Sequence, residues 1–125
     1  MKNDIVSREN LHLVVSEFYK SLLEDEQLNH FFKEFRDVKK LQAHLDVLVD
    51  FWDNTLFYSG SYKKNAIKPH INIHAEKTIS VKDFETWLFL FQKAIDENFN
   101  GPNANTLKSR ALSIATVMRI KLNIV

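Results

Sequence analysis

Residues 68–91, KPHINIHAEKTISVKDFETWLFLF, decide how the rest of the chain is arranged. The first half of this stretch has little periodicity and carries two histidines, His70 and His74. In the second half, Ser80 and Asp83 have the spacing of a helix-starting capping box, and apolar side chains then follow at helical spacing. We interpret His70 as the ligand of a buried metal or cofactor on one side of a pocket, with the helix after Ser80 as a wall of that pocket.

Apolar side chains recur at helical spacing on both sides of this stretch, which predicts an all-α fold. Helices are expected over residues 7–23, 38–57 and 102–123, besides the helix that starts at Ser80 and ends near Gly101. A shorter phenylalanine-rich segment, residues 25–35, is expected to form a corner packed against something large and flat. Two glycines and two prolines in 125 residues are too few turn-formers for an all-β fold.

The composition limits the classes of function. A chain of 125 residues suits one domain, so a single domain over residues 1–125 is expected. A net charge of +1 gives no field to attract nucleic acid, and no apolar run reaches the roughly 18 residues of a membrane span. We therefore expect no nucleic-acid or membrane partner and a cytoplasmic location, since the start of the chain also lacks a signal-peptide core. Without cysteine, a metal must be held by histidine, carboxylate or a prosthetic group.

Three predicted helices each direct a polar side chain inward: Tyr19, His44 and Trp87. Taken singly, Tyr19 could be a boundary residue with its hydroxyl in water, and His44 a core histidine bonded to a carbonyl. Together with His70 they suit a flat cofactor that is ligated on one side and faced by hydrogen-bond donors on the other. Haem fits this pattern, because it takes one neutral imidazole as axial ligand and many apolar contacts on its ring.

Short motifs run in a fixed order through nearly the whole chain. They are a Phe-Tyr pair at residues 18 and 19, Phe32, His44 followed by Phe51 and Trp52, the GxYxxN turn of Gly60, Tyr62 and Asn65, His70 before the FxxWLxLF run at residues 84–91, and DExFxG at residues 96–101. This ordered set resembles the group III truncated haemoglobins. One departure is Lys64, where most members have a glycine nearby, and we expect this surface difference to be harmless.

The resemblance implies a truncated globin fold, with helices packed two-over-two around a haem pocket, and haem b (iron protoporphyrin IX) as cofactor. It implies that His70 is the proximal iron ligand and that Tyr19, His44 and Trp87 line the distal side. Further haem contacts are expected from Phe32, Leu48, Phe51, Trp52, Tyr62 and Phe91. His74 has no role in the family pattern.

The resemblance also implies binding of O₂, NO and CO. Tyr19 and Trp87 would act as the catalytic groups by polarising a ligand that has gained electron density. Each such hydrogen bond contributes on the order of 1 to 3 kcal/mol, which slows ligand release roughly tenfold. Slow release suits nitric oxide or peroxide chemistry, or ligand sensing, better than oxygen delivery. Turnover would need a separate reductase, and the chain is expected to be a monomer or a weak homodimer.

Two alternatives remain open at this point. In the first, the chain is a globin-like helical module that has lost haem and acts through protein contacts. In the second, His70 and His74 bind one metal ion in a plain helical bundle, although no third ligand is evident nearby.

Overall fold

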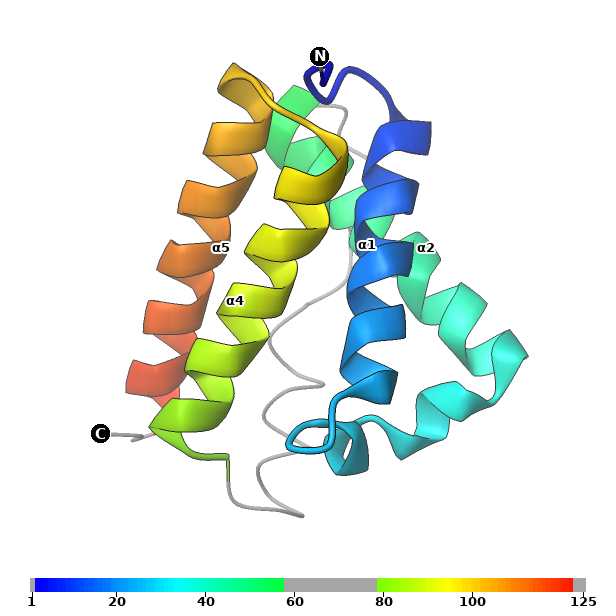
Figure 1. Ribbon diagram of the computed structural model, residues 1–125, viewed down its shortest axis with the longest axis vertical. Coiled ribbons are helices and arrows are strands. Elements are labelled where there is room, and N and C mark those ends of the chain that lie inside the picture. The colour runs from blue at the N-terminus through cyan, green and yellow to red at the C-terminus, as the bar shows by residue number, and fades with distance from the viewer. Residues whose placement is uncertain (1, 58–78, 123–125) are drawn as a thin grey trace.

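The computed structural model describes residues 2–57 and 79–122, and helices make up most of these residues (Figure 1). The α-helices are α1 (Arg8–Glu24), α2 (Val38–Phe57), α4 (Val81–Asn98) and α5 (Pro102–Lys121), and two short 3-10 helices are η1 (Asn29–Phe31) and η2 (Lys33–Arg36). The described ranges contain no strand. None of the helices within them is long and apolar enough to cross a membrane.

The helices begin where local signals predict. The Ser7 hydroxyl accepts a hydrogen bond from the first turn of α1. At the start of α4, the Ser80 hydroxyl accepts from the Asp83 backbone N–H and the Asp83 carboxylate accepts from the Ser80 N–H, so the predicted capping box is confirmed. Pro102 occupies the first turn of α5, where its missing N–H costs nothing.

The helices pack as two pairs, α1 with α2 and α4 with α5. Figure 1 shows α4 and α5 side by side, and α1 lies against both α4 and α2. Each helix contributes buried apolar side chains to one core, among them Leu11, Val14, Phe18, Leu22, Leu45, Trp52, Phe91, Ile95, Leu107 and Ala111. The predicted all-α, two-over-two packing is therefore confirmed.

The phenylalanine-rich corner between α1 and α2 consists of η1 and η2. The Asp25 carboxylate accepts hydrogen bonds from the backbone N–H groups of Gln27 and Leu28, at 2.9 and 3.0 Å, and so turns the chain at the end of α1. Phe32 and Phe35 are buried beyond this turn. The corner thus directs aromatic rings inward, toward the space between α1, α2 and α4.

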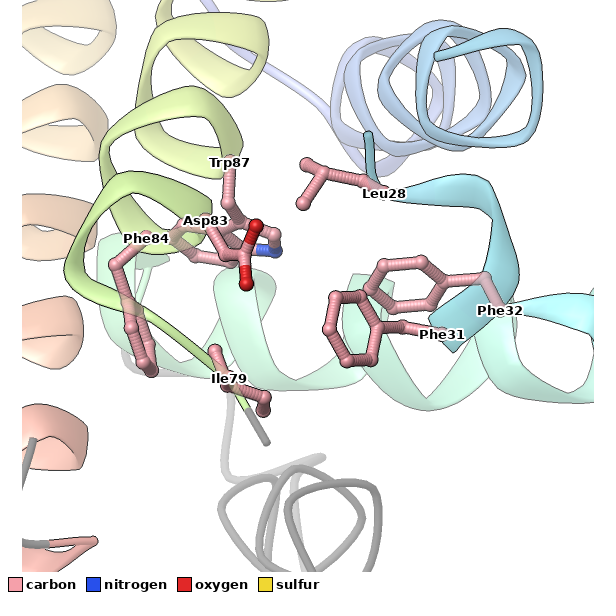
Figure 2. Close-up of a pocket in the computed structure, with 7 residues that line it drawn as sticks. All are labelled: Leu28, Phe31, Phe32, Ile79, Asp83, Phe84 and Trp87. Atoms are coloured by element: carbon pink, nitrogen blue, oxygen red, sulfur yellow. The ribbon is translucent and has the colours of Figure 1, made fainter. Parts of the chain in front are cut away.

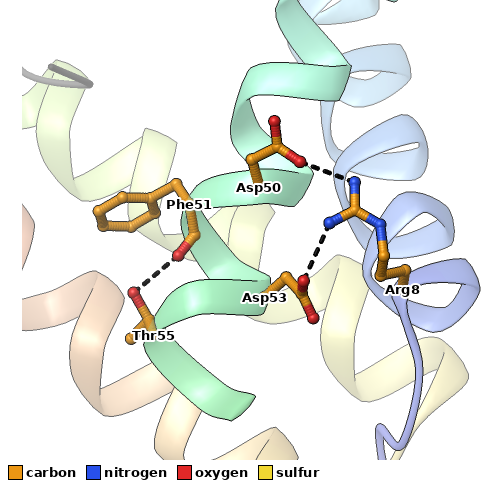
Figure 3. A network of polar contacts seen from close by, with 5 residues as sticks. All are labelled: Arg8, Asp50, Phe51, Asp53 and Thr55. Atoms are coloured by element: carbon orange, nitrogen blue, oxygen red, sulfur yellow. Dashed lines mark hydrogen bonds and ion pairs between the residues drawn. The ribbon is translucent and has the colours of Figure 1, made fainter. Parts of the chain in front are cut away.

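Figure 3 shows how α1 is tied to α2 at its first turn. The Arg8 guanidinium bonds with the Asp53 carboxylate at 2.9 Å and the Asp50 carboxylate at 2.7 Å. Asp53 is only 7% exposed, so this is a largely buried carboxylate with a cation beside it. In the next turn of α2, the Thr55 hydroxyl donates to the Phe51 carbonyl oxygen at 2.8 Å.

The N-terminal residues close the turn between α4 and α5. The Asp4 carboxylate accepts hydrogen bonds from the backbone N–H groups of Asn103 and Ala104, both at 2.9 Å, and so caps α5 from a distant part of the chain. The Asn100 N–H donates to the Asn3 carbonyl oxygen at 2.9 Å. Gly101 joins the two helices with a φ of 148°, a conformation that only glycine adopts readily.

Candidate functional site

The buried Tyr19 and the half-buried His44 form a hydrogen-bonded pair. The Tyr19 hydroxyl oxygen lies 2.6 Å from Nε2 of His44, which joins α1 to α2. Tyr19 is 2% exposed, so the alternative of a boundary tyrosine with its hydroxyl in water is wrong. Burial, and to a smaller extent the nearby Glu34 carboxylate, raise the pKa of the Tyr19 phenol above its ordinary value. The phenol therefore keeps its proton and remains a hydrogen-bond donor at neutral pH.

Aromatic rings fix the orientation of this pair. The Phe35 ring stacks on the His44 imidazole, with centroids 4.4 Å apart and an interplanar angle of 17°. Phe18, Phe32 and Phe35 each meet the Tyr19 ring edge-on at 5.5 to 5.8 Å. Edge-to-face packing of this kind stabilises one ring orientation. The Tyr19 hydroxyl is thus aimed by its neighbours toward α2.

A cleft lies next to this pair, between the corner and the start of α4 (Figure 2). On the corner side it is lined by Leu28, Phe31 and Phe32, and on the other side by Ile79, Asp83, Phe84 and Trp87. Phe32 belongs to the cleft and also touches Tyr19, so one ring separates the cleft from the phenol. Apolar walls with few polar groups are typical of cofactor and ligand sites.

Trp87 contributes an indole N–H group to the wall of the cleft on α4. Figure 2 shows its indole nitrogen on the side of the ring that faces the cleft. Phe18 packs edge-on against the Trp87 ring at 5.4 Å, and Phe91 stacks behind it at 6.0 Å with an interplanar angle of 9°. Phe18 therefore touches both predicted donor residues, Tyr19 and Trp87, and spaces them apart.

Polar side chains link the two walls at the rim. The Gln27 side-chain amide donates to the Asp83 carboxylate at 2.8 Å and its carbonyl oxygen accepts from the Thr86 hydroxyl at 3.0 Å. Partial burial acts to raise the pKa of Asp83, but hydrogen bonds from Ser80 and Gln27 and the nearby His30 imidazole hold it below its ordinary value. Asp83 is therefore an ionised carboxylate at neutral pH.

The remaining predicted site residues are buried in the core, half-buried on α2, or outside the described residues. Trp52 and Phe91 stack on each other in the core at 5.5 Å, with an interplanar angle of 22°, and Leu48 and Phe51 are half-buried on α2. His70, His74 and Tyr62 lie outside the described residues. The roles of these residues in holding haem stay predictions. Within residues 2–57 and 79–122, no three His, Asp or Glu side chains gather as metal ligands do.

Sequence patterns missed part of the cleft. Leu28 ends the turn after α1 and Ile79 directly precedes the N-cap Ser80, so neither lies on a periodic helix face and periodicity gives no sign of them. Asp83 is evident from the sequence only as a helix cap, although its side chain also belongs to the lining of the cleft. Its spacing of four from Trp87 places both on one side of α4, and this is the signal that could have found it.

The chemistry of these residues fits haem. The walls are aromatic and aliphatic, as a porphyrin face requires, and Tyr19, His44 and Trp87 carry O–H and N–H groups nearby. The space between these walls is about 30 Å³, which is far smaller than a porphyrin. The walls as they stand would therefore contact part of a porphyrin without enclosing it.

Comparisons with known proteins agree with this geometry. A family model described as bacterial-like globin matches residues 3–121. The group 3 truncated hemoglobin ctb of Campylobacter jejuni is 24% identical over 118 residues, which cover 93% of this chain and 91% of that protein. The crystal structure of group III truncated hemoglobin from Campylobacter jejuni matches with a TM-score of 0.85 at 23% identity, over 98% of this chain and 95% of that chain. The predicted fold and the predicted resemblance are both confirmed.

Proposed function

The chain belongs to the bacterial-like globin family, and from this premise we propose that it is a haem protein that binds O₂, NO and CO at an iron ligated by His70. Membership of a globin family implies a haem cofactor, and haem b is the form that we propose. The observation that carries the proposal is the hydrogen bond of 2.6 Å between the buried Tyr19 and the half-buried His44, close to an apolar cleft. Trp87 lines this cleft, and the ring of Phe32 separates the cleft from Tyr19. A helical bundle without a ligand gains little from placing polar side chains so close to an apolar cleft.

The described residues divide the work of ligand binding. When bound, haem supplies an iron centre that takes up diatomic gases. Phe31, Phe32 and Phe84 provide apolar walls that exclude water and strengthen any hydrogen bond inside the cleft. Tyr19 and Trp87 supply the O–H and N–H groups that stabilise negative charge on a diatomic ligand. His44 holds the Tyr19 hydroxyl in place and can exchange a proton with it.

Two donors favour slow release of O₂ over rapid exchange. If each donor contributes on the order of 1 to 3 kcal/mol and slows release roughly tenfold, the two together slow release about a hundredfold. We therefore propose nitric oxide or peroxide chemistry, or ligand sensing, in preference to bulk oxygen delivery. Turnover would draw electrons from a separate reductase. The acting unit is a single domain, as a monomer or weak homodimer.

Absorption spectroscopy tests the proposal directly. The purified chain is expected to carry haem with its strong visible absorption, and His70→Ala is expected to abolish or weaken that absorption. His74→Ala is the matched control, because it removes a second histidine four positions away. A chain that folds but takes up no haem would instead support a haem-free interaction module. Equal losses from the two variants would point to a metal shared by His70 and His74.

A further inference from the structure

Gln27 joins the two walls of the cleft through both ends of its side-chain amide. Its Nε2 donates to Oδ1 of Asp83 at 2.8 Å, and its Oε1 accepts from the Thr86 hydroxyl at 3.0 Å. We call Gln27, Asp83 and Thr86 the rim clamp. The opposite polarities of its two bonds fix the orientation of the amide, since reversing it would place the oxygen against a carboxylate.

Both ends of the rim clamp are anchored in the backbone. On the corner side, the Asp25 carboxylate holds the backbone N–H of Gln27 at 2.9 Å. On the α4 side, Asp83 also bonds with the Ser80 backbone N–H at 2.9 Å, so its carboxylate cannot turn without loosening the start of the helix. The rim clamp therefore joins two fixed points, and its length limits how far the corner and the first turns of α4 can separate.

The neighbours of the rim clamp residues are the walls of the cleft. Leu28 follows Gln27 directly, and Trp87 follows Thr86 directly, and both line the cleft. Each wall therefore has a rim clamp residue next to a cleft residue: Thr86 is next to the predicted donor Trp87, and Gln27 is next to the apolar Leu28. Phe18 packs edge-on against the Trp87 ring and Phe91 stacks on it, while the rim clamp holds the neighbouring residue Thr86.

We propose that Gln27 is a positioning residue for Trp87: the rim clamp sets the spacing of the cleft walls and thereby the place of the indole N–H. The role in ligand control rests on the proposed function, whereas the positioning of Trp87 does not. Gln27 itself touches no reacting atom. Its effect reaches the ligand through the position of α4.

Exchanging the amide of Gln27 and the carboxylate of Asp83 tests the proposal. In Gln27→Glu, two carboxylates face each other, so the bond to Asp83 becomes a repulsion. In the double variant Gln27→Glu/Asp83→Asn, the amide introduced at position 83 would donate to the new carboxylate while its oxygen still accepts from the Ser80 N–H. The Thr86 hydroxyl can donate to the same carboxylate. Gln42→Glu, the same change at an exposed position on α2, is the matched control.

Fluorine NMR of protein labelled with 5-fluorotryptophan reads the position of Trp87 directly. The chain has two tryptophans and gives two signals, which Trp52→Phe assigns. Gln27→Glu is expected to shift or broaden the Trp87 signal, to leave the Trp52 signal in place, and to be reversed by the double variant. If Gln27→Glu does not fold, Thr86→Val carries the test with a smaller shift of the same signal. A Trp87 signal that matches the Gln42→Glu control in both variants would overturn the proposal.

The rate of O₂ release supplies the second measurement. Gln27→Glu is expected to release O₂ about threefold to tenfold faster than the parent, and the double variant is expected to restore the parent rate. A Trp87 signal that moves without any change in this rate would overturn the role in ligand control. A parent protein that takes up no haem would contradict the proposed function, while the fluorine signals would still decide the positioning of Trp87.

Discussion

The Tyr19 hydroxyl and Nε2 of His44 lie 2.6 Å apart, and this contact connects α1 with α2 in the interior. A phenol is a stronger acid than a neutral imidazole, so the phenol O–H is the natural donor and Nε2 the acceptor. His44 thereby holds the one proton that Tyr19 can offer to a ligand. Under the proposed function, a bound ligand with greater negative charge than the imidazole nitrogen would take this hydrogen bond from His44.

Tyr19→Phe tests this stored donor. The substitution keeps the ring among Phe18, Phe32 and Phe35 and removes only the hydroxyl, so packing is preserved. The free energy of unfolding is expected to fall by about 1 kcal/mol, and O₂ release is expected to accelerate about tenfold. Denaturant unfolding and stopped-flow ligand displacement measure the two effects. Unchanged O₂ release in a folded, haem-bearing variant would exclude Tyr19 as a ligand donor.

The buried phenol also makes stability depend on alkaline pH. Burial raises the pKa of Tyr19 in the folded state, whereas in the unfolded chain it has the ordinary value of about 10. Its contribution to stability is therefore complete below about pH 10 and is lost as the pH rises toward the folded-state value. Between about pH 10 and 11, the parent is expected to lose up to about 1.4 kcal/mol more stability than Tyr19→Phe. Parallel slopes in the two proteins would show that the phenol ionises equally in both states.

Local sequence signals predicted the helices because their causes are local. Ser80 and Asp83 lie within one turn of each other and satisfy the first N–H groups of α4, and Pro102 marks the start of α5 in the same way. The Tyr19–His44 pair is different, since its members lie 25 positions apart. The helical pattern pointed both side chains inward toward one cofactor, and the family resemblance implied the same side of the pocket, but neither predicted that Tyr19 and His44 bond to each other.

The rim clamp could not be predicted from the sequence. Gln27 lies in a turn without periodicity, and its partners are 56 and 59 positions away. A glutamine carries no charge that would indicate its partner. The corner shows the same limit: a phenylalanine-rich pattern predicts burial, but the choice of two 3-10 helices depends on the Asp25 carboxylate and on the surfaces of α1 and α2.

Asp50 and Asp53 both pair with Arg8, so their contributions to stability can be compared directly. Asp50 is the more exposed partner, with 38% of its side chain accessible, while the Asp53 side chain is 10% accessible. Water screens the outer pair more strongly, so Asp50→Asn is expected to cost at most about 1 kcal/mol of stability. Asp53→Asn is expected to cost about 1 to 3 kcal/mol, because the inner pair is less screened. Chemical denaturation of both variants measures the difference, and equal costs would contradict the ranking.

At Gly101 a single added methyl group is expected to destabilise the fold. Its φ of 148° is unfavourable for any side chain, and an added Cβ would lie 2.5 Å from the Asp4 Cγ. Gly101→Ala therefore strains the backbone and pushes away the carboxylate that caps α5. The backbone strain costs about 1 to 3 kcal/mol and the lost cap about 1 kcal/mol more, so a loss of at least about 2 kcal/mol is expected.

A double-mutant cycle separates these two costs. Asp4→Ala removes the cap without straining the turn and is expected to cost about 1 kcal/mol. If Gly101→Ala acts partly by displacing Asp4, the double variant will be less destabilised than the sum of the two single variants, by about the value of the cap. Strict additivity in thermal or denaturant unfolding would mean that the clash is relieved elsewhere and that backbone strain alone explains the glycine. The cycle thus decides whether the N-terminal residues hold the α4–α5 turn in place or merely lie over it.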